Sequence, residues 1–574
     1  MYAFLRRLAG APTSISPLRS YASLTPRDVL RNTSDETGTL FTRFAKHIAL
    51  ERHRDREHVL PKTTVRYADF FPITDDHHFH RSVQQTDASQ LPALIILASS
   101  YKSNAAVPMY VAALNALDAR AESQLKKMDT NTVLETLYSF LFLMPGWMKR
   151  MDFFQAAVQR LAKENYSDNK ERFVQVCFYL GLQKKQAHLT SDFQELLENQ
   201  LQGHLAALSE LDLAVISNAA YKTSTVVTGE ARKPYESALV DAVLNLELTE
   251  ENGALLISFV KALRLQRVMD ERVCLYLQDI CLDPNKLALI EPRGLAHIFS
   301  FFAEQLWDQK ECLNVLIEKL MNELKPGQLR AKDLATFLWA SAQLDCELSP
   351  QHIRQVELAA LRKLDHGEYD YFPDNLVDTC LSLCTLGHYS KDLIDAAEKL
   401  KAAQRQTRAQ PKVDSRLTVL RSAVAIEQPS IASHKTEKAF KEFERAPTYL
   451  LRERTDLRKY ALDLGQDSEV EGVDLVCPIS GINLPSLRVQ TMGDQATVYF
   501  VELLTENQTL KFSKKPTSLL RLKKRLLESL GHKVVVLNST EMATNAKELQ
   551  QLLNPVAEAA AADDDSKIVQ GVSN

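Results

Sequence analysis

A pattern of apolar residues that returns about every forty residues most limits how this chain can fold. Each copy begins at an apolar anchor and continues at helical spacing, as in Lys332–Asp345, KDLATFLWASAQLD. A single helix pair cannot bury its apolar stripe, whereas stacked pairs share one continuous core. The spacing therefore predicts a mostly α fold, an α-solenoid of about eight 40-residue helix-pair repeats. The anchors are Leu94, Leu134, Val174, Leu213, Leu255, Leu295, Leu334 and Leu376, which lie 39 to 42 residues apart.

The second helix of each repeat is predicted from an amphipathic stretch after the anchor helix. After Leu348, the sequence SPQHIRQVELAALRKL places Ser349 as an N-cap and Pro350 at the first helical position. Only 17 glycines occur in 574 residues, which disfavours turn-rich β folds and glycine-looped nucleotide enzymes. The sequence has no run of eighteen apolar residues, so we expect no membrane span.

The N-terminal residues have the composition of a mitochondrial presequence. Arg6, Arg7 and Arg19 all precede the first acidic residue, Asp28, and serines and threonines are interspersed among them. An arginine-rich and acid-poor terminus is typical of mitochondrial targeting. We therefore expect residues 1–21 to be a presequence and the protein to work in the mitochondrial matrix.

The repeat pattern stops near residue 400, and a different kind of sequence follows. A basic stretch without acidic residues leads from Glu398 to Asp414, and β-forming residues then cluster at Asp474–Cys477, Thr497–Leu504 and Lys533–Leu537. These clusters predict a small α/β domain. The predicted order is a presequence at 1–21, an N-terminal extension at 22–90, the helical-repeat solenoid at 91–400, a basic linker and helix at 401–470, the α/β domain at 471–555 and a disordered tail at 556–574.

The segment from Thr509 to Lys533 concentrates positive charge. It has a net charge of +7, although the whole chain carries −4. The sequence predicts a helix at Ser518–Leu530, a left-handed Gly531 and then a strand. A basic helix face suits a phosphate backbone, so alanine at Arg521, Lys524 and Arg525 is expected to weaken RNA binding. The predicted RNA-binding residues are Lys511, Lys514, Lys515, Arg521, Lys523, Lys524, Arg525 and Lys533.

This strand–helix–glycine–strand order resembles the RAP domain. Val498–Leu504 matches the first strand of that family, Ser518–Leu530 the basic helix, Gly531 the glycine and Val534–Leu537 the last strand, within Asp474–Leu553. RAP domains commonly follow helical repeats of octotricopeptide-like or Fas-activated-kinase-like proteins, which act on RNA in mitochondria and chloroplasts. The resemblance implies a restriction-endonuclease-like fold. It also implies mitochondrial rRNA or mRNA, and ribonucleoprotein or ribosome-assembly proteins, as partners.

The same resemblance bears on catalysis. Nucleases of that fold use acidic residues at the end of the central strand to hold Mg²⁺. Glu502 fits the first acidic position, but Leu504 and Thr505 stand where family members place Asp and Gly, and Glu506 fits only if the register shifts. We therefore expect that the protein is not an enzyme, and Glu502 is only a weak catalytic candidate. We also expect that it binds no cofactor and has no metal site.

Isolated features elsewhere favour structural roles. The histidines of DDHHFHR, which begins at Asp75, suggest a polar loop, and Cys380 and Cys384 lie in an apolar setting typical of a core. Trp307 and Trp339 are expected to pack against neighbouring repeats. The sequence has no P-loop, dinucleotide, zinc-protease or serine-hydrolase motif.

Three hypotheses on function follow. The first is a non-catalytic mitochondrial RNA-binding factor in RNA processing, stability or translation. The second is a scaffold subunit of a mitochondrial ribosome-assembly or RNA-editing complex, favoured because acidic repeats repel phosphate. The third and least favoured is a metal-dependent RNA nuclease.

Overall fold

The computed structural model describes most of the chain from residue 75 to residue 538. The described ranges are 75–99, 107–143, 148–183, 187–250, 252–324, 329–370, 372–403, 410–431, 439–452, 454–466, 470–492 and 497–538. The predicted presequence and the predicted tail lie outside these ranges. The chain divides into two compact units between Val273 and Cys274.

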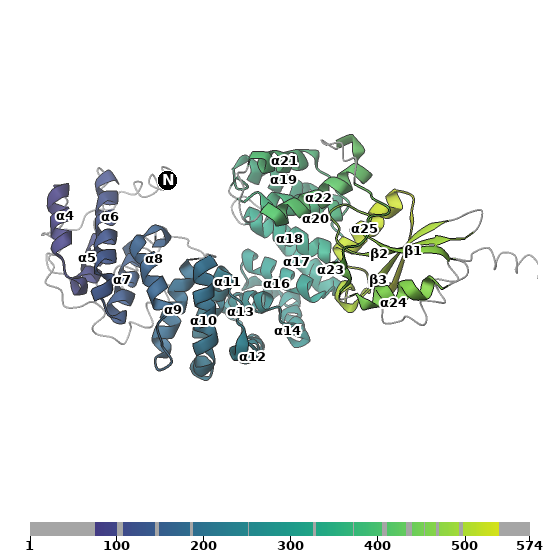
Figure 1. The fold of residues 1–574 in the computed structure, drawn as a ribbon. Helices are drawn as coiled ribbons and strands as arrows, with labels where there is room; N and C mark the ends of the chain where they lie inside the picture. Colours follow the sequence, from purple (N-terminus) through teal and green to yellow (C-terminus); the bar gives the residue numbers. More distant parts are fainter. Residues whose placement is uncertain are drawn as a thin grey trace, which may run out of the picture. The chain divides into compact units, whose positions relative to one another are not determined.

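The first unit is built from helices that stack in two rows (Figure 1). Helices that carry the anchors pack on one another in chain order, and the helices between them form the other row. The anchor row is α5 (Leu91–Ser99), α7 (Thr130–Leu143), α9 (Lys170–Leu182), α11 (Glu210–Thr223) and α13 (Gly253–Gln266). The other row is α4 (Asp76–Gln85), α6 (Val107–Gln124), α8 (Asp152–Leu161), α10 (Ala187–His204) and α12 (Arg232–Leu244). The histidines predicted in a polar loop lie in α4 instead, where Asp75 caps the helix through the backbone N–H of His77.

The second unit repeats this arrangement after α14 (Glu271–Leu282), which spans the boundary. The anchor helices α16, α18 and α20 pack on one another in that order, α22 packs next on α20 and extends the row, and α17 packs on α19. The helices are α15 (Pro284–Ala288), α16 (Pro292–Gln305), α17 (Lys310–Asn322), α18 (Ala331–Gln343), α19 (Pro350–Asp365), α20 (Asp374–Thr385), α21 (Lys391–Ala403) and α22 (Gln410–Glu427). The row therefore continues through α22, one helix beyond residue 400.

The anchors occupy equivalent places in these helices. Five lie in the anchor row of the first unit and three in α16, α18 and α20 of the second unit, and all are buried except Leu255, which is half-buried. The predicted cap of α19 is also confirmed, because the Ser349 side chain accepts a hydrogen bond from the backbone N–H of His352 and Pro350 begins the helix. The eight cysteines are unpaired, and Cys380 and Cys384 are buried as predicted. None of the helices in the described ranges is long and apolar enough to cross a membrane.

A small α/β part completes the second unit. A mixed sheet has the strand order β1-β2-β3-β4, in which β1, β2 and β3 are antiparallel and β4 is parallel to β3. Its elements are α23 (Thr448–Leu451), α24 (Thr455–Leu464), β1 (Val470–Val476), β2 (Ser486–Thr491), β3 (Val498–Leu504), α25 (Ser518–Ser529) and β4 (Lys533–Asn538). The three predicted strands correspond to β1, β3 and β4. No strand is predicted from the sequence at β2, where Leu487 and Val489 alternate with polar residues over only a short stretch.

Helices cover both faces of the sheet. Leu457, Tyr460 and Leu464 of α24 pack on one face, against a core that includes Leu487 and Val501. The other face meets α25, which crosses between the parallel strands β3 and β4. Gly531 ends this crossover with φ 86°, as the sequence predicts.

A glycine also fixes how closely the α/β part approaches the helix row. Gly481 has φ +85°, and a Cβ at this position would come within 2.9 Å of the backbone nitrogen of Val419 in α22. Ser422 of α22 donates a hydrogen bond to the carbonyl of Ser480, at 2.9 Å. Any larger residue at position 481 would push the turn away from α22.

Candidate nucleic-acid interface

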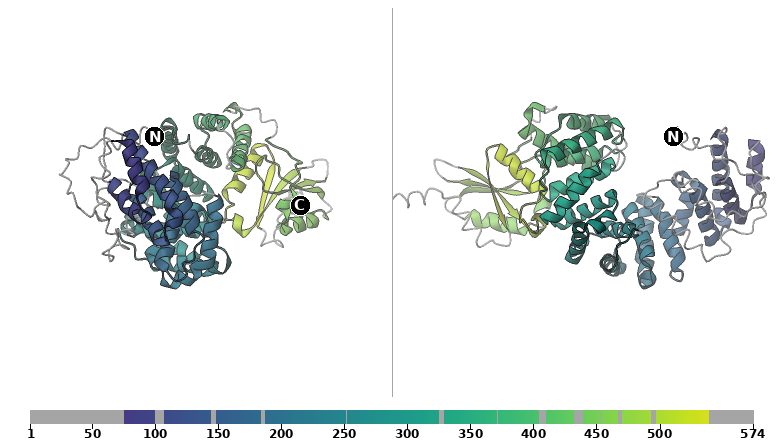
Figure 2. Two further views of the ribbon diagram at one scale, coloured as in Figure 1. Left: turned by 60° about the vertical axis from the view of Figure 1, so that its left-hand side comes forward. Right: turned by 180° about the vertical axis from the view of Figure 1, so that it is seen from behind.

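The basic helix α25 lies between the sheet and the ends of the anchor helices (Figures 1 and 2). It packs against β4 on one side and against α18, α20 and α22 on the other. Leu522, Leu526 and Leu527 are fully buried as a result, while Leu530 is 38% exposed. A helix that is covered on two sides has little surface left for a ligand.

Two arginines of α25 are used in this contact. The Arg521 Nε lies 3.1 Å from the Asp345 carboxylate, and Arg521 also donates to the Ala342 carbonyl at the end of α18. The Arg525 Nε donates to Glu427 at 2.7 Å, and its other nitrogens donate to carbonyls at the end of α20. The carboxyl end of a helix carries partial negative charge, so it attracts these cations in the way that carboxylates do.

Burial and pairing affect the two guanidinium groups differently. Burial lowers the pKa of Arg521 despite its neighbour Asp345. Burial also acts to lower the pKa of Arg525, but the hydrogen bond and charge of Glu427 outweigh it and raise that pKa. Both groups are held by the helix row, and 19% of the Arg521 side chain and 34% of the Arg525 side chain remain exposed.

Lys523 is buried inside the α/β part, away from any surface. Its Nζ lies 2.8 Å from Glu502 Oε1 and donates to the Leu484 carbonyl at 2.7 Å. Ser486 Oγ donates to the same Glu502 oxygen at 2.6 Å. The side chains of Lys523 and Glu502 are 0% and 3% exposed. The arrangement is a closed ion pair, in which the Glu502 carboxylate is already neutralised by an ammonium group.

The position of Glu506 also differs from what a metal site of the restriction-endonuclease-like fold needs. Glu502 pairs with Val536 in the parallel register, and β3 ends at Leu504. Glu506 begins a short 3-10 turn, η8 (Glu506–Gln508), after the strand. The register therefore does not bring Glu506 to the strand position two residues after Glu502. Within the described ranges, no three His, Cys, Asp or Glu side chains gather in a possible metal site.

The loop before α25 is held rigidly against the helix row. Asp308, which follows α16, accepts the backbone N–H groups of Phe512 and Ser513 at 2.8 and 3.0 Å. Phe512 also packs edge-on against Trp307, with ring centroids 4.8 Å apart. The loop closes on itself through the Leu510 N–H and the Lys515 carbonyl, at 2.8 Å. We call residues 509–516 the basic loop.

The basic loop carries three cations of the predicted set, of which Lys514 and Lys515 are exposed and Lys511 is half-buried. Lys514 is exposed and has a φ of 58°. The Lys511 Nζ lies 5.2 Å from the centre of the Trp307 ring, a cation–π distance. Phe512 lies between them in sequence and is 51% exposed. Lys515 is 55% exposed as well, and its Nζ pairs with Asp345 at 2.6 Å.

The last two residues of the predicted set lie elsewhere. Lys524 is on α25 and faces Glu528 at 3.7 Å, with 41% of its side chain exposed. Lys533 begins β4 and lies over the Tyr499 ring, 5.2 Å from its centre. The eight predicted residues thus fall into three groups: Arg521 and Arg525 are largely covered by the helix row, Lys523 is buried, and Lys511, Lys514, Lys515, Lys524 and Lys533 reach solvent, although Lys515 also pairs with Asp345.

The acidic partners of this contact were not predicted. Asp308, Asp345 and Glu427 lie at or just beyond the ends of α16, α18 and α22. The available sequence signal is that each acid comes at the end of an anchor helix. This signal does not say which distant group each acid contacts. Asp308 and its partner Phe512, for example, are 204 residues apart in the sequence.

No protein-family model matches this chain, and no curated protein matches it at a significant level. The resemblance to the RAP domain therefore rests on the residues and the order of elements given above.

Proposed function

We propose that this chain is a non-catalytic mitochondrial RNA-binding factor that serves in RNA processing, stability or translation in the matrix. In this proposal the anchor helices belong to an α-solenoid of about eight forty-residue repeats, and the α/β part is a RAP-like domain. Mitochondrial rRNA or mRNA and the proteins of its ribonucleoprotein particles are the partners.

The observation that carries the proposal is the basic loop. Lys511, Phe512 and Lys514 combine two cations with an exposed ring, and the backbone of Phe512 is fixed by Asp308. Single-stranded RNA is bound by cations along its backbone and by aromatic rings on which its bases stack. A loop that is fixed before binding loses little conformational entropy when it meets RNA.

RNA affinity as a function of salt tests this proposal. Fluorescence anisotropy with a labelled single-stranded RNA is expected to show weaker binding for Lys511→Ala/Lys514→Ala. The slope of log affinity against log salt concentration should become shallower by about 1.4, because each lysine that contacts a phosphate of a single strand contributes about 0.7 to its steepness. The matched control is Lys391→Ala/Lys399→Ala, which removes two exposed lysines of α21. Equal affinity and slope in both variants would remove the basic loop from the RNA interface.

A scaffold subunit is the second candidate, and one observation favours it. Arg521 and Arg525 are paired with acids of the helix row and largely covered, and Lys515, although 55% exposed, is paired with Asp345, so acids already balance the charge of three cations of the +7 segment. RNA crosslinking in purified mitochondria separates the candidates. Crosslinks at the basic loop and along the anchor helices support an RNA-binding factor, whereas protein crosslinks without RNA crosslinks support a scaffold.

A further inference from the structure

One face of helix α18 carries a stripe of side chains that reach solvent, with Lys332 and Trp339 exposed and Thr336 and Gln343 half-buried. Lys332, Thr336, Trp339 and Gln343 are spaced four, three and four residues apart, which puts them on one face of a helix. Trp339 is 36% exposed, although the sequence analysis predicts it in the core. Trp307, the other tryptophan predicted there, is 2% exposed. We call these four residues the α18 stripe.

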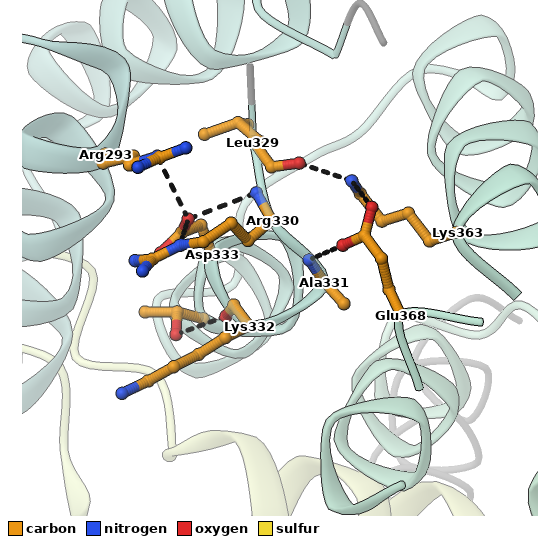
Figure 3. Close-up of polar contacts among 9 residues, drawn as sticks. Arg293, Leu329, Arg330, Ala331, Lys332, Asp333, Lys363 and Glu368 are labelled. Carbon is orange, nitrogen blue, oxygen red and sulfur yellow. Dashed lines mark hydrogen bonds and ion pairs between the residues drawn. The ribbon is translucent and has the colours of Figure 1, made fainter. Parts of the chain in front are cut away.

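Cations gather at the first turn of the α18 stripe. Arg330 pairs with Asp333 at 2.7 Å, and Arg293 of α16 reaches the same carboxylate at 4.0 Å. Lys332 lies beside them and is exposed. Figure 3 shows Arg293, Arg330 and Lys332 on one side of this turn, with Lys363 and Glu368 on the other. Two arginines share one carboxylate and Lys332 adds a third cation at the same turn, so these four residues keep a net positive charge.

These cations remain available to a ligand. The side chains of Arg293 and Arg330 are 42% and 47% exposed, whereas the Asp333 side chain is only 4% exposed. A guanidinium group has five N–H donors, and a single carboxylate uses only some of them. The buried carboxylate thus holds the two arginines while close to half of each arginine side chain stays exposed.

The other end of the α18 stripe meets the α/β part. Gln343 accepts a hydrogen bond from Ser518 of α25 at 2.6 Å, and Asp345 pairs with Lys515 of the basic loop. From Lys332 to Gln343 the helix rises about 16 Å. The stripe therefore runs from a cationic group, past an exposed indole ring, to the contact with the α/β part.

We propose that the α18 stripe binds single-stranded RNA, with phosphates on Arg293, Arg330 and Lys332 and a base stacked on Trp339. The proposal deepens the proposed function and rests on it. Charge complementarity selects a polyanion, and the indole selects one that carries flat rings. An acidic peptide would satisfy the cations but would not use Trp339 in this way.

Acidic side chains on the neighbouring helix α20 limit the path that the RNA strand can take. Helix α20 presents Asp374 and Asp378 from its first two turns, and Asp378 is paired with Arg416 at 2.6 Å. Arg293 lies on the opposite neighbour, α16. The phosphates are therefore expected on the α16 side of the α18 stripe, where they approach Arg293 and avoid Asp374.

Substitutions at Trp339 in the full-length chain test the stacked base. Anisotropy with a fluorescein-labelled single-stranded RNA of mixed sequence should show affinity about 5- to 100-fold weaker for Trp339→Leu. Trp339→Phe should keep most of the affinity, because it keeps a ring. The salt slope should not change in either variant, since the indole is uncharged. Leu358→Ala, at a 48% exposed position of α19, is the matched control.

A charge substitution tests the phosphate end. Lys332→Ala should weaken binding and lower the salt slope by about 0.7. Unaltered thermal unfolding of each variant would show that the fold is kept. The inference is overturned if Trp339→Leu and Lys332→Ala bind RNA as the unaltered chain does, and the proposed function then stands on the basic loop. Failure of the unaltered chain to bind any RNA overturns the proposed function itself.

A second ligand identifies the occupant. Poly-glutamate of matched charge is expected to bind weakly, and its binding should not depend on Trp339. Poly-glutamate binding that Trp339→Leu reduces as much as it reduces RNA binding would overturn RNA as the occupant.

Discussion

At the scale of single residues, the clearest feature is the Lys523–Glu502 pair. Both side chains are withdrawn from water, and the ammonium group is satisfied by a carboxylate and the Leu484 carbonyl. Removing water from two charges is costly, and the mutual attraction repays that cost only while both partners are present. The pair therefore acts as a structural element that joins α25 to β3.

Substitution of Glu502 separates a structural role from a catalytic one. Glu502→Gln leaves Lys523 charged and unpaired in the interior, so the free energy of unfolding should fall by about 3–5 kcal/mol. Lys523→Met/Glu502→Gln should lose less than Glu502→Gln alone, because the unpaired buried charge is gone. Urea unfolding measures both variants. Unchanged stability together with loss of Mg²⁺-dependent RNA cleavage would instead identify Glu502 as a catalytic residue.

At the scale of secondary-structure elements, the contact between α25 and the anchor helices dominates. The carboxyl-terminal ends of these helices contact the α/β part in chain order. Asp308, after α16, binds the basic loop, and the end of α18 binds Arg521. The ends of α20 and α22 both bind Arg525. Hydrogen bonds to charged groups contribute about 1.5–3 kcal/mol each. The basic face of α25 that suggested RNA thus stabilises the second unit.

Exchange of charge across this contact tests that role. Arg521→Asp should weaken the contact, because it places an acid beside Asp345. Arg521→Asp/Asp345→Arg should restore part of the stability. Hydrogen exchange of the α25 amides reports the contact, with faster exchange expected in the single variant and slower exchange in the double variant. Equal exchange in the two variants and the unaltered chain would mean that Arg521 does not hold α25 in place.

At the scale of the whole molecule, charge is distributed unevenly along the chain. A net charge of −4 includes a cationic N-terminus and the +7 segment. The predicted presequence lies outside the described ranges, so its role is a matter for experiment.

Import into isolated mitochondria tests the presequence. Deletion of residues 1–21 is expected to abolish uptake, because the arginines that respond to the membrane potential are lost. The imported full-length chain should acquire an N-terminus at or near Ala22, as read by mass spectrometry of the processed protein. Uptake of the shortened chain at the normal rate would exclude residues 1–21 as the targeting signal.

The sequence by itself determined the anchor-helix row, the left-handed Gly531, the cap at Ser349 and three of the four strands. These features follow from local periodicity and from backbone preferences within a few residues. The tertiary structure alone decided which cations face solvent. Lys523, Lys524 and Arg525 are consecutive, yet one is buried against Glu502, one is exposed and one is paired with Glu427. The partner of a charged side chain depends on residues far away in the chain, and only folding brings them together.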